Sequence, residues 1–215
     1  MSWVKSVADP SGVWSPRENH AVVASDANTI VLMGGYDDKN QNMNDVYKSN
    51  DVNGKWSKWI KVLVSAPWDG RGGHAAILVG NSIIGSSIII FGGSQVSQTI
   101  SYGDVWVSVT DLTTSDVGLK WVAGSLNINT FTSRSSHNVL MSGSNIILSG
   151  GKAGGTYFNE MWSTNINCIP GYYCSEVGGS PKPCAAGTYC PTNTIFPIKC
   201  VTGSYCPSKS AGEVI

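Results

Sequence analysis

Three runs of consecutive aliphatic residues, each ending in a Gly-Gly pair, divide the first part of this chain. They read T-I-V-L-M-G-G from Thr29, S-I-I-I-F-G-G from Ser87 and N-I-I-L-S-G-G from Asn145. The Gly pairs begin at residues 34, 92 and 150, which is a period of 58 residues. A fixed period of this length indicates an array of similar structural units. Aliphatic runs bounded by turn residues predict strands that are buried on both faces.

The sequence around each run predicts a unit of four short strands. An Arg-x-x-His element comes first, and an apolar strand follows the His (H-A-V-V-A, H-A-A-I-L-V and H-N-V-L-M). The aliphatic run is the second strand, and a third strand of alternating apolar and polar residues begins at N-D-V-Y, G-D-V-W or N-E-M-W. The fourth strand carries Trp59 or Trp121. No helix pattern occurs, so we predict an all-β fold.

The first and third units depart from this pattern. Trp3 stands before its Arg-x-x-His element as Trp59 and Trp121 stand before theirs, and no fourth strand follows Thr164. The chain is therefore expected to begin inside a unit and to be a fragment of a longer protein. The alternative is that the strand at Trp3 completes the last unit of a small assembly.

The repeated residues resemble the kelch family of β-propellers over residues 1–167. The resemblance is carried by the Gly pairs, the aliphatic runs before them, and the Asp-Val-Tyr/Trp and Trp positions after them. The stretch Ser49–Trp56 approximates an Asp box, as in a kelch variant. The resemblance implies about three four-stranded blades. Because four to eight blades close a propeller, we expect a partial ring whose open blade edges favour self-association.

Six cysteines define a second region, residues 168–215. They lie at a 16-residue period as repeated C-x5-C pairs: Cys168, Cys174, Cys184, Cys190, Cys200 and Cys206. So short a segment with few aliphatic residues needs cross-links for stability, and six cysteines allow 15 pairings. Zinc is the less favoured alternative, because its sites prefer closer Cys pairs, often with His. The C-x2-G-x-Y-C-P pattern resembles the cysteine-rich ephrin-receptor-like repeats of cell-surface proteins.

Composition and charge exclude several classes of partner. Lys and Arg together number 14, as do Asp and Glu, so the chain has no basic excess with which to bind nucleic acid. The longest apolar stretch is too short to span a membrane, and no signal peptide is seen. Disulfides form in oxidising compartments. We therefore expect an extracellular or cell-surface location, with the signal peptide on a missing N-terminal part.

Catalysis is not expected, because the candidate residues recur in every unit. All three Arg and all three His belong to the Arg-x-x-His elements, which leaves no His for a copper site and no Arg cluster for a sialidase. We expect no catalytic residue, no cofactor and no metal, and we interpret the oxygen-rich stretch Asp37–Asn44 as a solvated turn rather than a calcium loop. The residues given a structural role are Arg17, His20, Gly34, Gly35, Arg71, His74, Gly92, Gly93, Arg134, His137, Gly150 and Gly151.

The candidate binding residues lie on loops. Aromatic residues three positions before each Arg (Trp14, Trp68 and Phe131) would either plug the space between blades or form a rim for sugars or a protein. The loops after the Gly pairs differ in sequence, as ligand-binding loops on a repeated scaffold do; the first contributes Tyr36, Asp37 and Asp38. We predict a non-catalytic module for a protein or glycan, with the cysteine region as a stalk. Alternatives are part of a secreted propeller enzyme and an intracellular kelch adaptor.

Overall fold

The computed structural model describes residues 14–26, 29–52, 55–79, 87–111, 116–124, 131–174 and 180–214. All of its regular elements are strands, and they form small antiparallel sheets, so the all-β prediction is confirmed. No helix within these ranges is long and apolar enough to cross a membrane. Trp3 and the turn at residues 53–54 of the Asp-box-like stretch lie outside the described residues.

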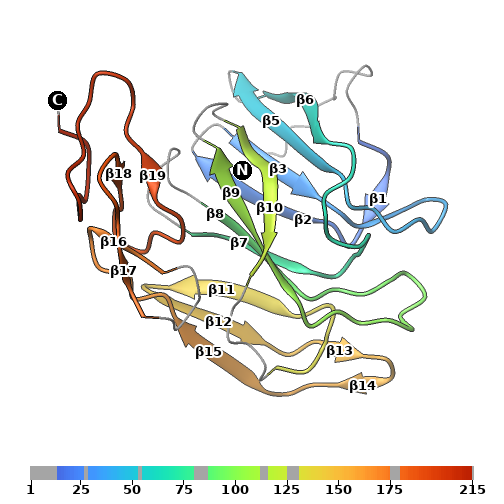
Figure 1. Ribbon diagram of the computed structural model, residues 1–215. Coiled ribbons are helices and arrows are strands. Elements are labelled where there is room, and N and C mark those ends of the chain that lie inside the picture. The colour runs from blue at the N-terminus through green and yellow to red at the C-terminus, as the bar shows by residue number, and fades with distance from the viewer. Residues whose placement is uncertain are drawn as a thin grey trace, which may run out of the picture.

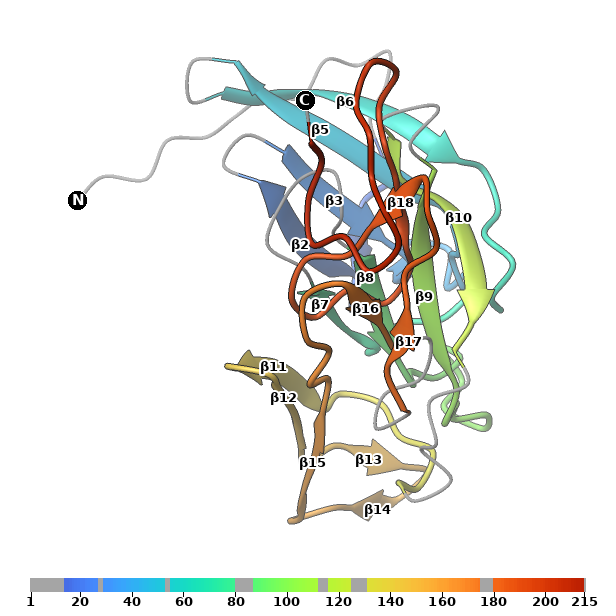
Figure 2. The same ribbon diagram turned by 60° about the vertical axis from the view of Figure 1, so that its left-hand side comes forward.

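Each predicted unit forms one sheet. The first has the order β2-β3-β5-β6, with strands Ala21–Asp26, Thr29–Met33, Val46–Val52 and Lys55–Leu63. The second has the order β7-β8-β9-β10, with strands Ala75–Val79, Ser87–Phe91, Val105–Asp111 and Asp116–Ala123. The third has three strands, β11 (Asn138–Ser142), β12 (Asn145–Ser149) and β15 (Met161–Asn165). The sheets lie side by side in a row, with β7 in contact with both β2 and β11 (Figure 1; Figure 2).

Two apolar cores fill the spaces between the sheets. Alternate residues of one strand face opposite neighbours: Ile88 and Ile90 pack toward the first unit, and Ile89 and Phe91 pack toward the third. These four side chains are at most 2% exposed. The aliphatic runs are continuous because β8 is covered on both faces, as the sequence predicts.

Pairs of two-residue strands extend the units. Strand β1 (Arg17–Glu18) pairs with β4 (Tyr36–Asp37), and β13 (Lys152–Ala153) pairs with β14 (Thr156–Tyr157). In the cysteine region, β16 (Tyr172–Tyr173) pairs with β17 (Lys182–Pro183), and β18 (Thr188–Tyr189) pairs with β19 (Ile198–Lys199).

Each C-x5-C pair closes on itself. The disulfides join Cys168 to Cys174, Cys184 to Cys190, and Cys200 to Cys206, with Cα–Cα distances of 5.9, 6.3 and 6.2 Å. Backbone hydrogen bonds then link each cysteine repeat to the next. The amide of Gly171 donates to the carbonyl of Cys190, and the same bond recurs 16 residues later from Gly187 to Cys206. The repeats therefore stack on their neighbours.

The first cysteine repeats pack against the third unit. Ile195 is 4% exposed and belongs to the same apolar core as Ile146 and Leu148, with Phe196 beside it. The amide of Ile166 donates to the Ser144 carbonyl, and the Ser144 hydroxyl lies 3.4 Å from the Asn193 amide nitrogen. The cysteine region is thus attached at the β11–β12 turn, the end of the sheet away from Gly150 and Gly151.

Candidate ligand-binding face

The loops after the three Gly pairs gather along one edge of the molecule. We call residues 36–44, 94–103 and 152–159 together the loop face; it lies at the right of Figure 1, and the cysteine region lies at the left. The first two loops touch, because the amide of Val96 donates to Oδ1 of Asn42 at 2.7 Å and the Tyr36 hydroxyl donates to the Ser94 carbonyl at 2.9 Å. The first two loops of the loop face therefore form one connected surface across two units.

An arginine ties each loop to its sheet. Nη1 of Arg17, Arg71 and Arg134 donates to the carbonyl of the first glycine of its own Gly pair at 2.9, 2.9 and 2.8 Å. Nε donates to the backbone carbonyl two residues earlier. The guanidinium also pairs with the acid that precedes the third strand of its unit: Asp45, Asp104 or Glu160. Each arginine therefore joins three segments of its own unit: the residues just before the Arg, the Gly pair, and the start of the third strand.

Two of the acidic partners, Asp104 and Glu160, are stabilised in their charged form. Burial raises the pKa of Asp104, but the hydrogen bonds and charge of Arg71 outweigh it and hold the pKa below its ordinary value. The hydrogen bond from Arg134 likewise lowers the pKa of Glu160. The indole N–H groups of Trp106 and Trp162 donate to these same carboxylates at 2.8 and 2.9 Å. Both carboxylates therefore have an arginine and an indole N–H as partners within their own unit.

His74 and His137 pack against the Gly pair of the preceding unit. A Cβ atom on Gly34 would lie 2.7 Å from Cε1 of His74, so only glycine fits there. Burial, with the charge of the neighbouring arginine, lowers the pKa of His74 to about 3 and that of His137 to about 4. Both imidazoles are therefore neutral at physiological pH, which suits packing better than proton transfer.

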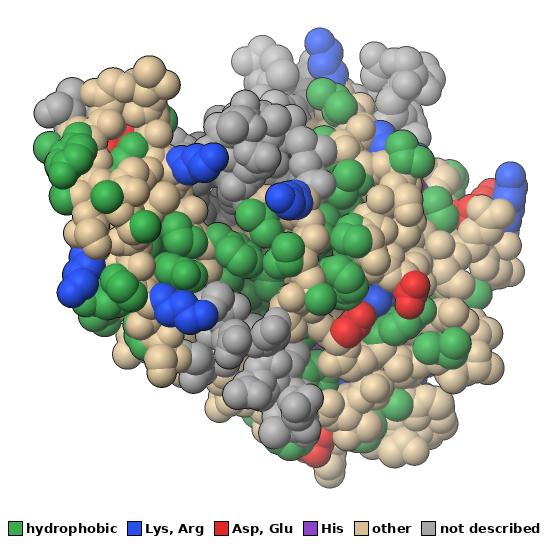
Figure 3. Space-filling model, in the orientation of Figure 1, with side chains coloured by type: hydrophobic (Ala, Val, Ile, Leu, Met, Phe, Trp, Pro, Cys, Tyr) green, Lys and Arg blue, Asp and Glu red, His purple; other side chains and the backbone are tan. Residues whose placement is uncertain are grey.

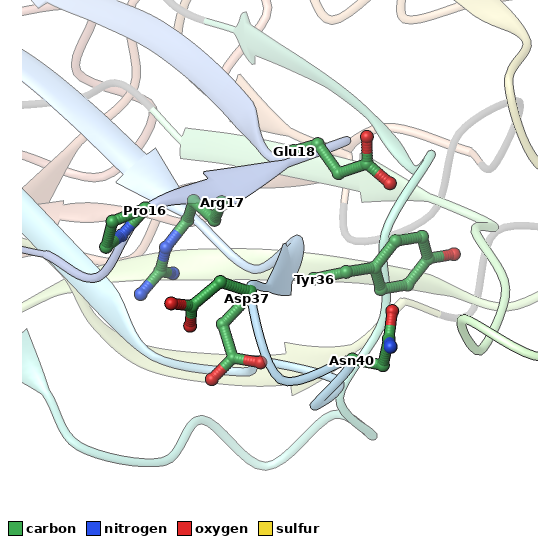
Figure 4. Close-up of a pocket in the computed structure, with 7 residues that line it drawn as sticks. Pro16, Arg17, Glu18, Tyr36, Asp37 and Asn40 are labelled. Carbon is green, nitrogen blue, oxygen red and sulfur yellow. The ribbon is translucent and has the colours of Figure 1, made fainter.

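A pocket of about 350 Å³ opens on the loop face of the first unit. It is lined by Pro16, Arg17, Glu18, Tyr36, Asp37, Asp38 and Asn40. Figure 4 shows that these side chains come from β1 and from the loop that follows the Gly pair. Three of the predicted binding residues, Tyr36, Asp37 and Asp38, therefore meet in one hollow.

The pocket has a surplus of negative charge. Arg17 is compensated by Asp45, whose carboxylate lies 2.6 Å from Nη1 and is 3% exposed. Oδ1 of Asp37 accepts from the backbone amides of Lys39 and Gln41 at 3.0 and 2.8 Å, which holds the loop turn. Asp38 and Glu18 are exposed to solvent. The free carboxylates suit a cationic group on a ligand.

The predicted aromatic residues are not displayed on a rim. Trp68 is 1% exposed and Phe131 is 9% exposed, because both fill the cores between units. Trp14 packs its ring against Trp59 and His20. Tyr36 is 5% exposed and its ring lies against Gly72 of the second unit, so it mainly joins two units. Trp68 and Phe131 therefore plug the apolar cores, and we assign them no ligand contact.

Sequence reasoning missed Glu18 and Asn40 as pocket residues. Glu18 lies inside an Arg-x-x-His element, where the other units have Gly72 and Ser135. This departure from the repeat could have marked Glu18 as a binding residue, because a residue with only a packing role is expected to recur in every unit. Within the described residues, no group of three or more His, Cys, Asp and Glu side chains is placed to hold a metal ion.

Comparison with known proteins agrees with the repeat. No curated protein matches the sequence. The family model described as KLHDC2/KLHL20/DRC7 Kelch-repeats domain matches residues 1–193, a span that includes all three units and reaches into the cysteine region. Domains of this kind are typically protein-interaction modules. With three sheets of the kelch pattern and a match over most of its length, this chain belongs to the kelch-repeat family.

Proposed function

We propose that this protein is a non-catalytic recognition module whose loop face binds a protein, with the pocket at Glu18, Asp37 and Asp38 receiving a Lys or Arg side chain. The observation that carries the proposal is the pocket, in which the one cation is already paired with a buried carboxylate. An added cation would be attracted to Glu18 and Asp38 without competing with Arg17.

The loops favour a peptide or protein over a small molecule. The pocket is an open hollow beside a surface that continues onto the loop of residues 94–103. Charged side chains are sparse on the face shown in Figure 3, as the composition of 13% charged residues leads one to expect. A small acidic site on a weakly charged surface gives specificity for a correctly placed cation rather than general affinity for basic molecules.

The test is selection from a phage-displayed library of random peptides. We expect the wild-type protein to enrich peptides with a Lys or Arg at a fixed position. The double variant Glu18→Gln/Asp38→Asn should bind those peptides about fivefold to tenfold more weakly, since exposed ion pairs contribute up to about 1 kcal/mol each. Glu213→Gln, an acid-to-amide change in the cysteine region, is the control. Equal affinity of the double variant and the wild type would contradict the proposal.

We propose an extracellular or cell-surface location, supported by the three disulfides, which persist in oxidising compartments. A thiol count on the native protein, isolated with its thiols trapped, separates this from the intracellular adaptor alternative. A count near zero agrees with the proposal, and a count near six would contradict it. A glycan ligand remains the alternative to a protein, and a glycan array with the same variants distinguishes the two.

A further inference from the structure

The two junctions between neighbouring units use the same backbone hydrogen bonds. At the first, the Gly35 amide donates to the Arg71 carbonyl at 2.8 Å and the Arg71 amide donates to the Met43 carbonyl at 3.0 Å. At the second, Gly93 donates to Arg134 at 2.8 Å and Arg134 donates to Tyr102 at 3.1 Å. The junction is therefore a standard part of the repeat: a Gly pair and loop on one unit receive the Arg-x-x-His element of the next.

The third unit presents the same receiving surface, but none of the residues that the structure describes fills it. Gly150 and Gly151 have φ angles of 63° and 96°, close to the 62° and 97° of Gly34 and Gly35. No described residue accepts a hydrogen bond from the Gly151 amide. A Cβ on Gly150 would meet only the Phe158 carbonyl of its own unit, whereas the same position at Gly34 and Gly92 is closed by the next Arg and His.

Two apolar positions beside this surface are exposed in the third unit and buried in the other two. Met161 is 72% exposed, whereas the equivalent Val46 and Val105 are 0% and 2% exposed. Leu140 is 51% exposed, whereas the equivalent Val23 and Ile77 are both 7% exposed. Repeat positions that are buried twice and exposed once mark a docking face without its partner. Figure 1 shows this sheet at the lower end of the row.

The first unit carries the complementary element in its docked conformation. Asn19, Gly73 and Ser136, the third residues of the three Arg-x-x-His elements, have φ angles of 54°, 63° and 56°. Among the described residues, the Arg17 backbone makes no bond to the Gly pair or loop of another unit, whereas the Arg71 and Arg134 backbones do. Val22 is 49% exposed, although its equivalents Ala76 and Val139 pack against a preceding unit.

We propose that the third unit binds the first unit of a second copy of this chain. The Arg17 element of one copy docks on the Gly150–Gly151 pair of the other, and its Val22 covers the face formed by Leu140 and Met161. The interface is heterologous, and two copies close through two such junctions into one ring of six units. The sequence predicts self-association of a partial ring, and this proposal specifies which surfaces of the two copies meet.

Arg17 and Glu18 belong both to the docking element and to the pocket, so the test uses Val22 and Met161, which do not line the pocket. Dimer formation and peptide binding are then measured separately, and the failure of one can be told from the failure of the other. The test is the mass of the full chain in solution by sedimentation velocity. We expect wild type at twice the 22.7 kDa mass of one chain. Val22→Glu and Met161→Glu, both at exposed positions, should weaken association on the order of a hundredfold, because each buries an unpaired charge. Val201→Glu, at a 52% exposed position in the cysteine region, should stay dimeric.

Mixing the two variants tests the head-to-tail geometry. Val22→Glu keeps an intact third unit and Met161→Glu keeps an intact first unit, so a mixed pair has one intact junction and one junction that carries both glutamates. The mixture should therefore associate one to one, more tightly than either variant alone and more weakly than the wild type. A monomeric wild type would overturn the proposal. So would a dimeric Val22→Glu variant, which would indicate pairing of one third unit with another. A mixture that associates no more tightly than either variant alone would also overturn it.

Discussion

At the residue scale, the same arginine environment is built three times. Arg71 and Arg134 are 0% exposed, and each joins a carbonyl of its Gly pair to a carboxylate at the start of the third strand. The planar guanidinium serves three directions at once, through Nε, Nη1 and Nη2, which a lysine ammonium cannot do. A charge buried this deeply depends on all of its partners.

Arg71→Lys should therefore destabilise the fold strongly. We expect a loss of about 3 kcal/mol in the free energy of unfolding, since the change leaves buried carbonyls and Asp104 without their donors. Urea unfolding measures it. The control Lys39→Ala, at an exposed loop position, should change stability by no more than about 0.5 kcal/mol. An equal effect of both changes would show that the buried arginine does not stabilise the unit.

The buried histidines predict a loss of stability in acid. Their pKa values of about 3 for His74 and about 4 for His137 lie below the ordinary 6.5. Between pH 6.5 and about 4 the unfolded chain binds protons that the folded chain does not, so stability falls as pH falls, by up to about 1.4 kcal/mol per pH unit for each histidine. Thermal unfolding from pH 7 to pH 4 checks this. His74→Gln/His137→Gln should flatten the slope, and an unchanged slope would contradict the assignment.

Recurrence in the sequence predicted which residues repeat but not what they touch. The Arg, His and Gly positions could be read from the 58-residue period. That Arg17 meets Asp45, 28 residues away, depends on the return of the third strand to the start of the unit. The burial of Trp68 could not be predicted from spacing either, because an aromatic side chain on a loop can point to solvent or into the core. Here its ring packs against Trp121 and His74.

At the element scale, the strands of the three units agree with the sequence because hydrophobic period and turn residues are local signals. The pairing of the cysteines could not be predicted in the same way, because their regular spacing is compatible with every pairing. The structure chooses the nearest partners, each with a sequence separation of 6. The attachment of the first cysteine repeats to the third unit could not be predicted either, because Ile195 lies far along the chain from Ile146 and Leu148.

Mapping the disulfides checks the pairing. Glu176 lies between the first and second Cys pairs, and Lys199 lies between the second and third. Cleavage after both residues under non-reducing conditions should release three separate peptides, each with one intact disulfide. Peptides that remain joined would show pairing between repeats. Each bridge should contribute about 2 kcal/mol, because it closes only a short loop.

Ile195 should hold the cysteine region on the third unit. Ile195→Ala is expected to cost about 2–4 kcal/mol, as for other buried aliphatic residues. The measurement is urea unfolding together with limited proteolysis of the segment around residue 195. Ile169→Ala is the matched control, because Ile169 is 51% exposed. If both variants are equally stable, the contact in the core contributes little.

At the scale of the whole molecule, the two proposed surfaces differ in physical character. The proposed ligand is attracted to the pocket by exposed carboxylates, whereas the proposed dimer contact buries the exposed apolar side chains Leu140 and Met161 and adds backbone hydrogen bonds. Raising the ionic strength from about 0.05 to 0.5 M should weaken peptide binding several-fold, because salt screens exposed charges. Dimer dissociation over the same range should change little. Parallel titrations measure both, and a shared salt dependence would contradict the assignment.

The stacking of the cysteine repeats has a consequence for how this protein can change in evolution. Each repeat bonds to the one after it through contacts that recur every 16 residues, and the core of the third unit takes Ile195 and Phe196 from the segment between the second and third Cys pairs. In-frame duplication of the third repeat would therefore add one more layer without altering that attachment. The distance between the C-terminus and the propeller units is thus a length that gene duplication can adjust in fixed steps.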